Sequence, residues 1–499
     1  MKTNSASASV PASKSARAEK NSGLAHWMRA VQKEIVRAGD GFHADPVHDL
    51  RVALRRCRSM VDGLRAIDPD KSWKKMRRQA TELFDSLGDL RDCQVLMEWV
   101  EQLGKPDDPV TQRLLAYAKQ KETECKEHAR AAVARFDQEQ WERLTASLPR
   151  RAARLRPGSD AFKAIALEKW TDARMRESAA LKTGSPAAFH RLRITVKKLR
   201  YVVENFLPHL HEQWGSDFKK VQDWLGEIHD LDVLRDTAIT IGAYATDEEA
   251  AHWNHILRTE RDSRIERYKA KMVGEASLWK VWRAGLPSGP EARQAALGKL
   301  QAWSSFLESD QPHSRRVARL ALQLHDGLAK VGVLEGNRQR SREMLRAAAI
   351  VHEVGRYEGG KGHHKATQKM VGELDRLVGW TRQEQSMIAL IARYHRGALP
   401  SSAKLREVPL EQRKQTKLLS GILRLANAFD ADRDGAIRRI TVSKQNEFIL
   451  IQAEGLNPES TLAETIAGAR HLLEITCGIP VMVRTMPGTA RKPVRLSSK

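Results

Sequence analysis

Two matching stretches place histidine, arginine and lysine side chains at the same helical spacing. The first, HDLRVALRRCRSMVDGL, runs from His48 to Leu64, and the second, HRLRITVKKLRYVVENF, runs from His190 to Phe206. On an α-helix these cationic side chains would lie within about 80° of the first histidine, because successive residues are about 100° apart. The stripes are His48, Arg51, Arg55 and Arg58 in the first copy, and His190, Arg193, Lys197 and Arg200 in the second. No acidic residue stands at a stripe position, so the cations are expected to lack acidic partners and to bind an anion.

The opposite face of each stretch is apolar. It carries Leu50, Leu54, Cys57, Val61 and Leu64 in the first copy, and Leu192, Val196, Leu199, Val203 and Phe206 in the second. This spacing predicts a helix face that packs into a core. Like charges three and four residues apart weaken an isolated helix by a few tenths of a kcal/mol per pair. A basic stripe kept in both copies therefore favours a binding function over an ordinary solvated face.

The chain contains a tandem duplication. SLGDLRDCQVL (Ser86–Leu96) matches WLGEIHDLDVL (Trp224–Leu234), as the two basic helices match each other. Residues 24–284 predict about eight helices, four in each half, arranged as two related antiparallel bundles. AGLPSGPEA (Ala284–Ala292) predicts a linker, after which helical periodicity resumes. Beyond Gly435, RRITVSKQ, EFILIQAEG and VMVRT predict strands, with a helix over about Ser460–Cys477.

Composition limits the partners and the compartment. Lys and Arg number 85 against 62 Asp and Glu, a net charge of +23 that favours an anionic partner. The four cysteines show no CxxC spacing, which favours reduced thiols and a cytoplasmic protein. No apolar run approaches the roughly 18 residues that a membrane span needs. Residues 1–22 are rich in Ser, Ala and Lys and predict a disordered tail rather than a signal peptide.

The first half resembles the CHAD (conserved histidine α-helical domain) family. The duplicated H-x-x-R-x-x-x-[RK]-x-x-R helix and an L-G-x-x-x-D segment in each half carry the resemblance. The resemblance implies two pseudo-twofold-related four-helix bundles whose basic helices face one groove, and binding of inorganic polyphosphate. Arginine can hold phosphate oxygens through two parallel hydrogen bonds, which agrees with such a ligand.

The residues expected to bind polyphosphate come from both copies. They are His48, Arg51, Arg55, Arg56, Arg58, Arg91, His190, Arg193, Lys197, Lys198, Arg200, Tyr201 and His229. His229 matches a family histidine, whereas the first copy has Arg91 at that position. Nucleic acid is the rival ligand and is disfavoured, because the stripes lack the interleaved aromatic residues on which bases stack.

The second half resembles the HD-type helical domain of the exopolyphosphatase/guanosine pentaphosphate phosphohydrolase family. PHSRRVARLALQL, AAIVHEVGRYEGGKGHHKA and ALIARYHRGALP carry the resemblance, and the β-α-β end resembles that family's last small domain. The catalytic half of those enzymes has no counterpart here, so their hydrolytic machinery is not carried over. The expected organisation is a tail (1–22), a CHAD domain (23–285, with repeats 24–150 and 160–285), an HD-like domain (286–435), a small α+β domain (436–490) and a basic tail (491–499).

An HD domain can also hold a divalent ion that activates water. The candidate ligands are His313, His352, Glu353, His364, His395 and Asp430, and the candidate ions are Mg, Mn and Fe. Glu353 replaces the usual Asp, and Asn427 stands at the closing position. We therefore expect an accessory cationic site around His313, His364, Lys365, Arg393, His395 and Arg396, without hydrolysis. If the domain is catalytic, the resemblance implies a metal-dependent phosphohydrolase acting on polyphosphate or guanosine polyphosphates. Taken together, the sequence features predict a cytoplasmic protein that binds polyphosphate. Such a protein is a candidate for association with polyphosphate granules, and no membrane partner is expected.

Overall fold

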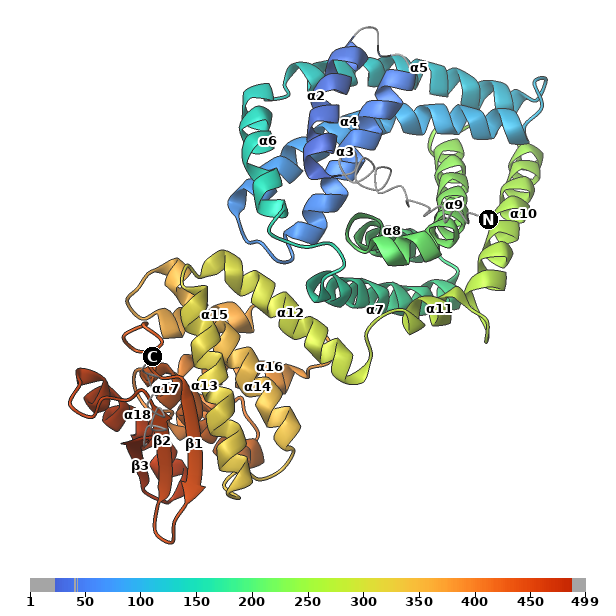
Figure 1. Ribbon diagram of the computed structural model, residues 1–499. Helices are drawn as coiled ribbons and strands as arrows, with labels where there is room; N and C mark the ends of the chain where they lie inside the picture. Colours follow the sequence, from blue (N-terminus) through green and yellow to red (C-terminus); the bar gives the residue numbers. More distant parts are fainter. Residues whose placement is uncertain (1–22, 40–41, 43, 487–499) are drawn as a thin grey trace, which may run out of the picture. The chain divides into compact units, whose positions relative to one another are not determined.

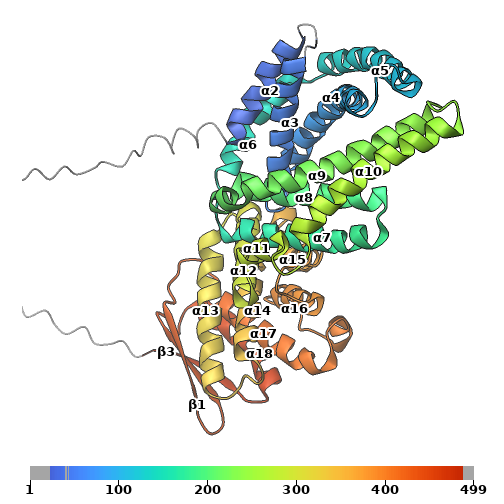
Figure 2. The same ribbon diagram turned by 90° about the vertical axis from the view of Figure 1, so that its right-hand side faces the viewer.

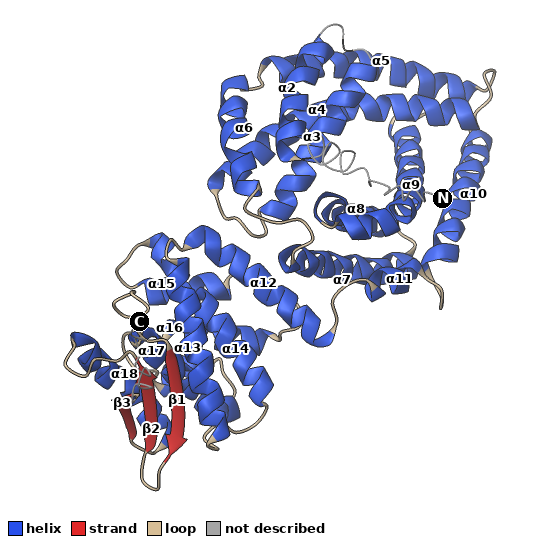
Figure 3. Cartoon of the chain, viewed as in Figure 1, coloured by secondary structure: helices blue, strands red, loops and turns tan. Residues whose placement is uncertain are grey.

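The computed structural model describes residues 23–39, 42 and 44–486. Within them it contains 17 α-helices and one small sheet, which confirms the predicted mainly-α class (Figures 1 and 3). The chain divides into two compact units, residues 1–287 and 288–499. The tails expected at residues 1–22 and 491–499 lie outside the described residues.

The N-terminal unit shows the duplication in its helix lengths. The first half has α2 (Leu24–Gly39), α3 (Ala44–Leu64), α4 (Lys71–Leu103), α5 (Pro109–Ala134) and α6 (Gln138–Ala152). The second half has α7 (Asp160–Thr183), α8 (Pro186–Phe206), α9 (Pro208–Thr240), α10 (Asp247–Met272) and α11 (Leu278–Ala284). The pairs α3 and α8, α4 and α9, and α5 and α10 have equal lengths of 21, 33 and 26 residues. Each half thus has four long helices followed by one shorter helix.

The two apolar stripes pack into the core as predicted. All ten of their side chains are buried, and the most exposed, Phe206, shows 4 % of its surface. The basic helices α3 and α8 also meet each other, where a Cβ atom at Gly63 would overlap the Phe206 ring. Ser59 accepts a hydrogen bond from the Asn205 side chain at 3.0 Å beside this contact.

A second contact joins the halves through the long helices (Figures 1 and 2). Leu96 and Leu114 of α4 and α5 share one apolar cluster with Leu231 and Trp253 of α9 and α10. The Trp253 indole donates to Asp108 Oδ2 at 3.0 Å across the same boundary. The two halves are therefore held both at α3–α8 and at the ends of the long helices.

The C-terminal unit is a helical assembly with a sheet at one side. Its helices are α12 (Gly289–Leu307), α13 (Gln311–Lys330), α14 (Arg338–Val351), α15 (His363–Gly372), α16 (Arg382–Arg393), α17 (Leu410–Ala428) and α18 (Thr461–Cys477). Two short 3₁₀ helices, η1 (Val354–Glu358) and η2 (Ser402–Leu405), connect them. Gly355 in η1 is required for packing, because a Cβ atom there would overlap the backbone of His363 and Thr367 in α15.

The sheet has the order β1-β2-β3. β1 (Arg439–Lys444) and β2 (Ile449–Glu454) are antiparallel, with Val442 opposite Ile451, and β2 is parallel to β3 (Val481–Thr485). α18 makes the β2-α18-β3 crossover, while α13 contacts β1 (Figure 3). The predicted β-α-β end is confirmed, with β1 added by a hairpin. No helix in the described ranges is long and apolar enough to cross a membrane.

The closeness of α3 to α8 gives a stability prediction. Gly63→Val should destabilise the protein by about 1–3 kcal/mol, because the side chain must displace Phe206 in a packed core. Gly226→Ala is the matched control, since nothing lies within 4 Å of its Cβ position. It should be neutral or stabilising by up to about 1 kcal/mol, because Ala favours helix more than Gly. Urea unfolding of the full chain, followed by circular dichroism, measures both. Equal stability of the two variants would contradict the packing described.

Candidate binding and metal sites

A cavity of about 360 Å³ lies between the two repeats of the N-terminal unit. Its lining comes from α3, α4, α8 and α9. Four of the expected polyphosphate-binding residues, Arg51, Arg193, Lys197 and His229, line it together. The two stripes therefore meet at one place, although their role in binding stays a prediction.

On the α3 side, two arginines lie over one aromatic ring. The guanidinium carbons of Arg51 and Arg58 are 4.5 and 4.4 Å from the centre of the Phe84 ring. Arg51 Nη1 also donates to the Phe84 carbonyl oxygen at 3.1 Å. Cation–π contacts of this kind fix both guanidinium groups beside Phe84, which lines the cavity.

On the α8 side, Lys197 is crowded by cations. Burial, reinforced by Arg193 and by Arg55 and Arg51 from α3, lowers the pKa of Lys197 to about 7. The ammonium and the neutral amine are thus both populated near neutral pH. A like charge held this close costs free energy unless an anion neutralises it.

Two histidines, His190 of α8 and His229 of α9, lie next to each other on this side. His190 Nδ1 and His229 Nδ1 are 3.4 Å apart, with ring centres separated by 4.6 Å. Burial and Arg193 lower the pKa of His229 to about 4, and the same two causes lower the pKa of His190. Both imidazoles are neutral at pH 7 and would gain charge only when an anion is near.

The expectation that the stripe cations lack acidic partners is wrong. Asp85, Asp89, Asp92 and Asp230 also line the cavity. Asp85 Oδ1 lies 3.4 Å from Arg58 Nη1. Burial raises the pKa of Asp230 to about 6, although Arg193 and Lys197 oppose the rise. Asp92 and Asp230 close the two L-G-x-x-x-D segments, whose position on the neighbouring helices could not be derived from a helical wheel.

The other expected residues are divided between solvent and internal contacts. His48, Arg55 and Lys198 are exposed, and Tyr201 is half-buried. Arg56 pairs with Glu204 and lies over the Trp27 ring, Arg91 pairs with Glu98 at 2.9 Å, and Arg200 donates to Gln222. Arg56 thus bridges α3 and α8, while Arg91, unlike its counterpart His229, is not among the residues that line the cavity.

The C-terminal unit holds a buried cluster of Glu353, His363 and His395. One potential ligand atom from each lies within 4.8 Å of the others, a grouping that could hold a metal ion. Glu353 Oε1 is 2.9 Å from His363 Nε2 and 3.4 Å from His395 Nε2. The extra methylene of Glu353 therefore does not keep its carboxylate away from the imidazoles.

The outward hydrogen bonds of these imidazoles fix which nitrogen faces the cluster. His363 Nδ1 donates to the Gly360 carbonyl at 3.0 Å, and His395 Nδ1 donates to the Ala392 carbonyl at 2.6 Å. In their neutral forms, both rings therefore turn an Nε2 lone pair towards the carboxylate. Three lone-pair donors converge, and they need either an added proton or a cation between them. Histidine ligands of metals typically donate their other nitrogen to a carbonyl in this way.

His352 has the same arrangement beside the cluster. Its Nδ1 lies 2.8 Å from the Ala349 carbonyl oxygen, and its buried Nε2 has no partner among the described residues. The His352 and His395 ring centres are 5.0 Å apart. Burial lowers the pKa of His352 to about 3, and the nearby His395 adds to the effect, so this imidazole is neutral.

His363 was not among the residues expected from the sequence, which indicated His364 instead. His363 is buried and shares a face of α15 with the buried Thr367 and Val371, four and eight residues on. That spacing was a usable signal, because adjacent helical residues point about 100° apart and only one of two histidines can face the core. His364 is partly exposed, and burial with His395 lowers its pKa to about 4.

The remaining expected ligands form a separate pair. His313 Nδ1 lies 2.7 Å from Asp430 Oδ2, and its Nε2 lies 3.2 Å from Asn427 Oδ1. Asp430 also accepts from Arg316 at 2.8 Å. Arg433 links this region to the cluster by pairing with Asp310 and, at 2.9 Å, with Glu353 Oε2. It does so with a φ of 61°, a conformation that costs a non-glycine residue about 1–2 kcal/mol.

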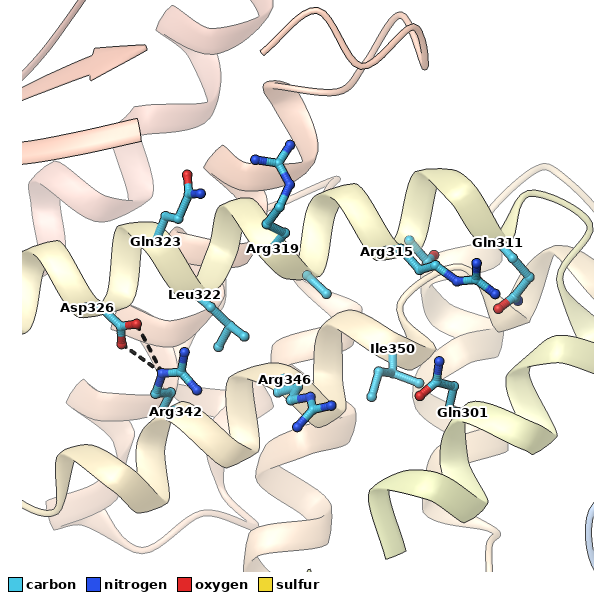
Figure 4. A pocket seen from close by; sticks show the side chains of 12 residues that line it. Gln301, Gln311, Arg315, Arg319, Leu322, Gln323, Asp326, Arg342, Arg346 and Ile350 are labelled. Atoms are coloured by element: carbon cyan, nitrogen blue, oxygen red, sulfur yellow. Dashed lines mark hydrogen bonds and ion pairs between the residues drawn. The ribbon is translucent and has the colours of Figure 1, made fainter. Parts of the chain in front are cut away.

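A larger cavity, of about 530 Å³, lies between α12, α13 and α14 (Figure 4). Its arginines are mostly used within the fold. Arg342 pairs with Asp326 at 2.9 Å, Arg319 donates to the Ile437 and Arg438 carbonyls on the far side of α13, and Arg346 donates to Gln294 at 3.2 Å. Three of the four arginines that line this cavity therefore have partners within the fold.

The comparisons with known proteins agree with both units. The family described as CHAD domain matches residues 22–238, and Ppx/GppA phosphatase, domain III, matches residues 293–465. Among solved structures, the crystal structure of the CHAD domain from the plant Ricinus communis is similar, with 21 % identity and a TM-score of 0.37. That match covers 52 % of this chain and 88 % of the plant domain. The chain therefore carries a CHAD domain followed by a Ppx/GppA phosphatase domain III.

Proposed function

We propose that this protein binds inorganic polyphosphate along the two basic stripes of its CHAD domain. The observation that carries the proposal is the meeting of Arg51 from one repeat with Arg193 and Lys197 from the other on one cavity. There, burial and the neighbouring arginines lower the pKa of Lys197 to about 7. Residues whose placement is unfavourable for the stability of the fold cluster at functional sites. A polyphosphate chain would neutralise this charge and release counterions, as other polyanions do. With this ligand and four free cysteines, a cytoplasmic location at polyphosphate granules is the matching compartment.

Nucleic acid fits the same cavity less well. Phe84 and Trp99 line it, so the cavity does contain aromatic rings. Phe84, however, has Arg51 and Arg58 over its ring, and Trp99 has Arg264 at 5.4 Å. Base stacking needs an open aromatic face, and these faces carry guanidinium groups.

Metal-dependent phosphohydrolysis in the C-terminal unit is the second candidate function. The convergence of Glu353, His363 and His395 favours it over the binding-only role expected from the sequence. When bound, a divalent ion there would supply a Lewis acid for phosphate and for water. Two imidazoles and one carboxylate suit iron better than magnesium, which prefers oxygen donors, and manganese lies between them.

Removing the central cations should abolish polyphosphate binding. The combined change of Arg51, Arg55, Arg193 and Lys197 to Ala should weaken binding by at least about 100-fold and flatten its salt dependence, because phosphate contacts are lost. Isothermal titration calorimetry with polyphosphate of defined length measures the affinity and its salt dependence. The control replaces four exposed lysines of the same unit, Lys71, Lys74, Lys105 and Lys182, by Ala and should bind nearly as wild type. Equal losses in both variants would show that only total charge matters.

Polyphosphate affinity should fall as pH rises. Lys197 has a pKa of about 7 in the free protein, and a bound polyanion favours its ammonium form, so binding takes up a proton. The dissociation constant should increase about tenfold between about pH 7 and 8.5. Asp230, with its pKa raised to about 6, acts in the same direction by becoming anionic at higher pH. Lys197→Arg should remove most of the change above pH 7, because a guanidinium keeps its proton. Lys182→Arg, at an exposed site, should keep the wild-type profile, and a flat wild-type profile would refute the assignment.

Metal binding should distinguish the two adjacent histidines. His363→Ala should lower the affinity for Fe²⁺ or Mn²⁺ by more than about 100-fold, since even the loss of an outer-shell partner costs 10–100-fold. His364→Ala should bind metal as the wild type does, because its ring is outside the cluster. Anaerobic titration of metal-free protein, followed by metal analysis, measures this. Retained metal in His363→Ala, or loss only in His364→Ala, would count against the cluster.

A further inference from the structure

The C-terminal unit has another cavity, of about 440 Å³, beside the Glu353–His363–His395 cluster. Glu353 and His395 are among its lining residues. Four arginines, Arg356, Arg396, Arg424 and Arg433, line it as well. A cavity lined by two residues of a potential metal site and by several guanidinium groups has the donors that a phosphate group requires.

The four arginines fall into two kinds. Arg356 and Arg433 pair with Glu353 Oε2, so their charge is used by that buried carboxylate. Arg396 and Arg424 have no ion pair with any described carboxylate. Both line the same cavity, and burial with the nearby Arg396 lowers the pKa of Arg424.

Arg424 is fixed in place yet incompletely bonded. Its Nη2 donates to the Gly397 carbonyl at 2.6 Å, which holds the guanidinium plane. Its buried Nη1 has no partner among the described residues. A buried charged donor without an acceptor is destabilising, so Arg424 Nη1 is placed for an acceptor that the described residues do not provide.

We propose that Arg396 and Arg424 form an oxyanion subsite that binds an inorganic phosphate group against a metal ion held by Glu353, His363 and His395. The inference rests on the second candidate function and names the ligand class of that site. Neither arginine belongs to the cluster. The sequence places Arg396 in the expected accessory cationic site, whereas Arg424 was not among the expected residues.

The lining of the cavity selects against a nucleoside. Apart from the charged and imidazole groups, its described residues are small or polar: Asn427, Ala428, Ala431, Thr465, Gly468 and Ala469. No aromatic or large aliphatic side chain is among them, whereas base-binding pockets are lined mainly by such groups. Gly468 and Ala469 of α18 leave room without offering a surface on which a base could stack. The ligand is therefore a base-free phosphate, either free or at the end of a phosphate chain.

The test uses metal affinity as its readout, so that phosphate bound at the CHAD domain does not contribute. Mn²⁺ binding to the full-length, metal-free protein is followed by electron paramagnetic resonance with and without inorganic phosphate. Phosphate should tighten Mn²⁺ binding about tenfold, within the usual range of coupling between sites. Arg396→Gln and Arg424→Gln should each lose most of this tightening while binding Mn²⁺ alone as wild type does. Arg406→Gln, an exposed arginine that does not line the cavity, is the matched control and should retain it.

The outcomes separate the subsite from the metal site. Normal Mn²⁺ binding with no phosphate effect, or an effect that survives in both Arg396→Gln and Arg424→Gln, overturns the subsite and leaves the metal proposal standing. Failure to bind Mn²⁺, Fe²⁺ or Zn²⁺ overturns both. Adenosine monophosphate in place of phosphate should tighten Mn²⁺ binding no more than phosphate does. A stronger effect of the nucleotide would overturn the base-free assignment.

Discussion

The repulsion between cations that face each other across α3 and α8 is the constraint on which the CHAD domain depends. Side chains three and four residues apart on each helix already repel, and the duplication sets two such helices against each other. The fold offsets this in two ways. Asp92 and Asp230, from the matching segments of α4 and α9, lie among the cations, and Phe84 takes two guanidinium groups on its ring. The remaining crowding is concentrated at Lys197. Internal carboxylates hold the cations of this site in position. A polyanion that enters it would therefore have to compete with these carboxylates for the cations.

The C-terminal unit has the inverse electrostatic problem. There, two imidazoles direct their Nε2 atoms towards a buried carboxylate, while Arg356 and Arg433 pair with its other oxygen. The backbone carbonyls of Gly360 and Ala392 hold the rings, so the lone pairs cannot turn away without breaking buried hydrogen bonds. Such an arrangement needs a positive charge at its centre. One chain thus combines a cavity in which cations crowd together with a buried cluster in which two imidazoles and a carboxylate converge.

The sequence predicted what depends on helical periodicity and local repeats. The apolar stripes, the duplication, the linker region and the strand positions all follow from spacing within one segment. Contacts between segments could not be predicted in this way. The Asp92 carboxylate near Arg51 comes from α4, about forty residues further along the chain, and Arg424 of α17 donates to the Gly397 carbonyl. His363 and His364 differ in another way: the family motif indicates His364, whereas the spacing of the buried residues in α15 indicates His363.

Comparison of the two repeats shows where the repulsion is relieved. Three of the four stripe positions carry the same residue in both copies: His48 and His190, Arg51 and Arg193, Arg58 and Arg200. The fourth has the exposed Arg55 in one copy and the half-buried Lys197 in the other. A guanidinium cannot lose its proton in a protein, whereas an ammonium can do so when it is desolvated. An arginine at position 197 would keep a full charge in the most crowded place whether or not an anion is present. The lysine allows the site to lower its charge by releasing a proton and to regain that charge when an anion binds. The single difference between the stripes therefore lies at the position where a second arginine would be most destabilising.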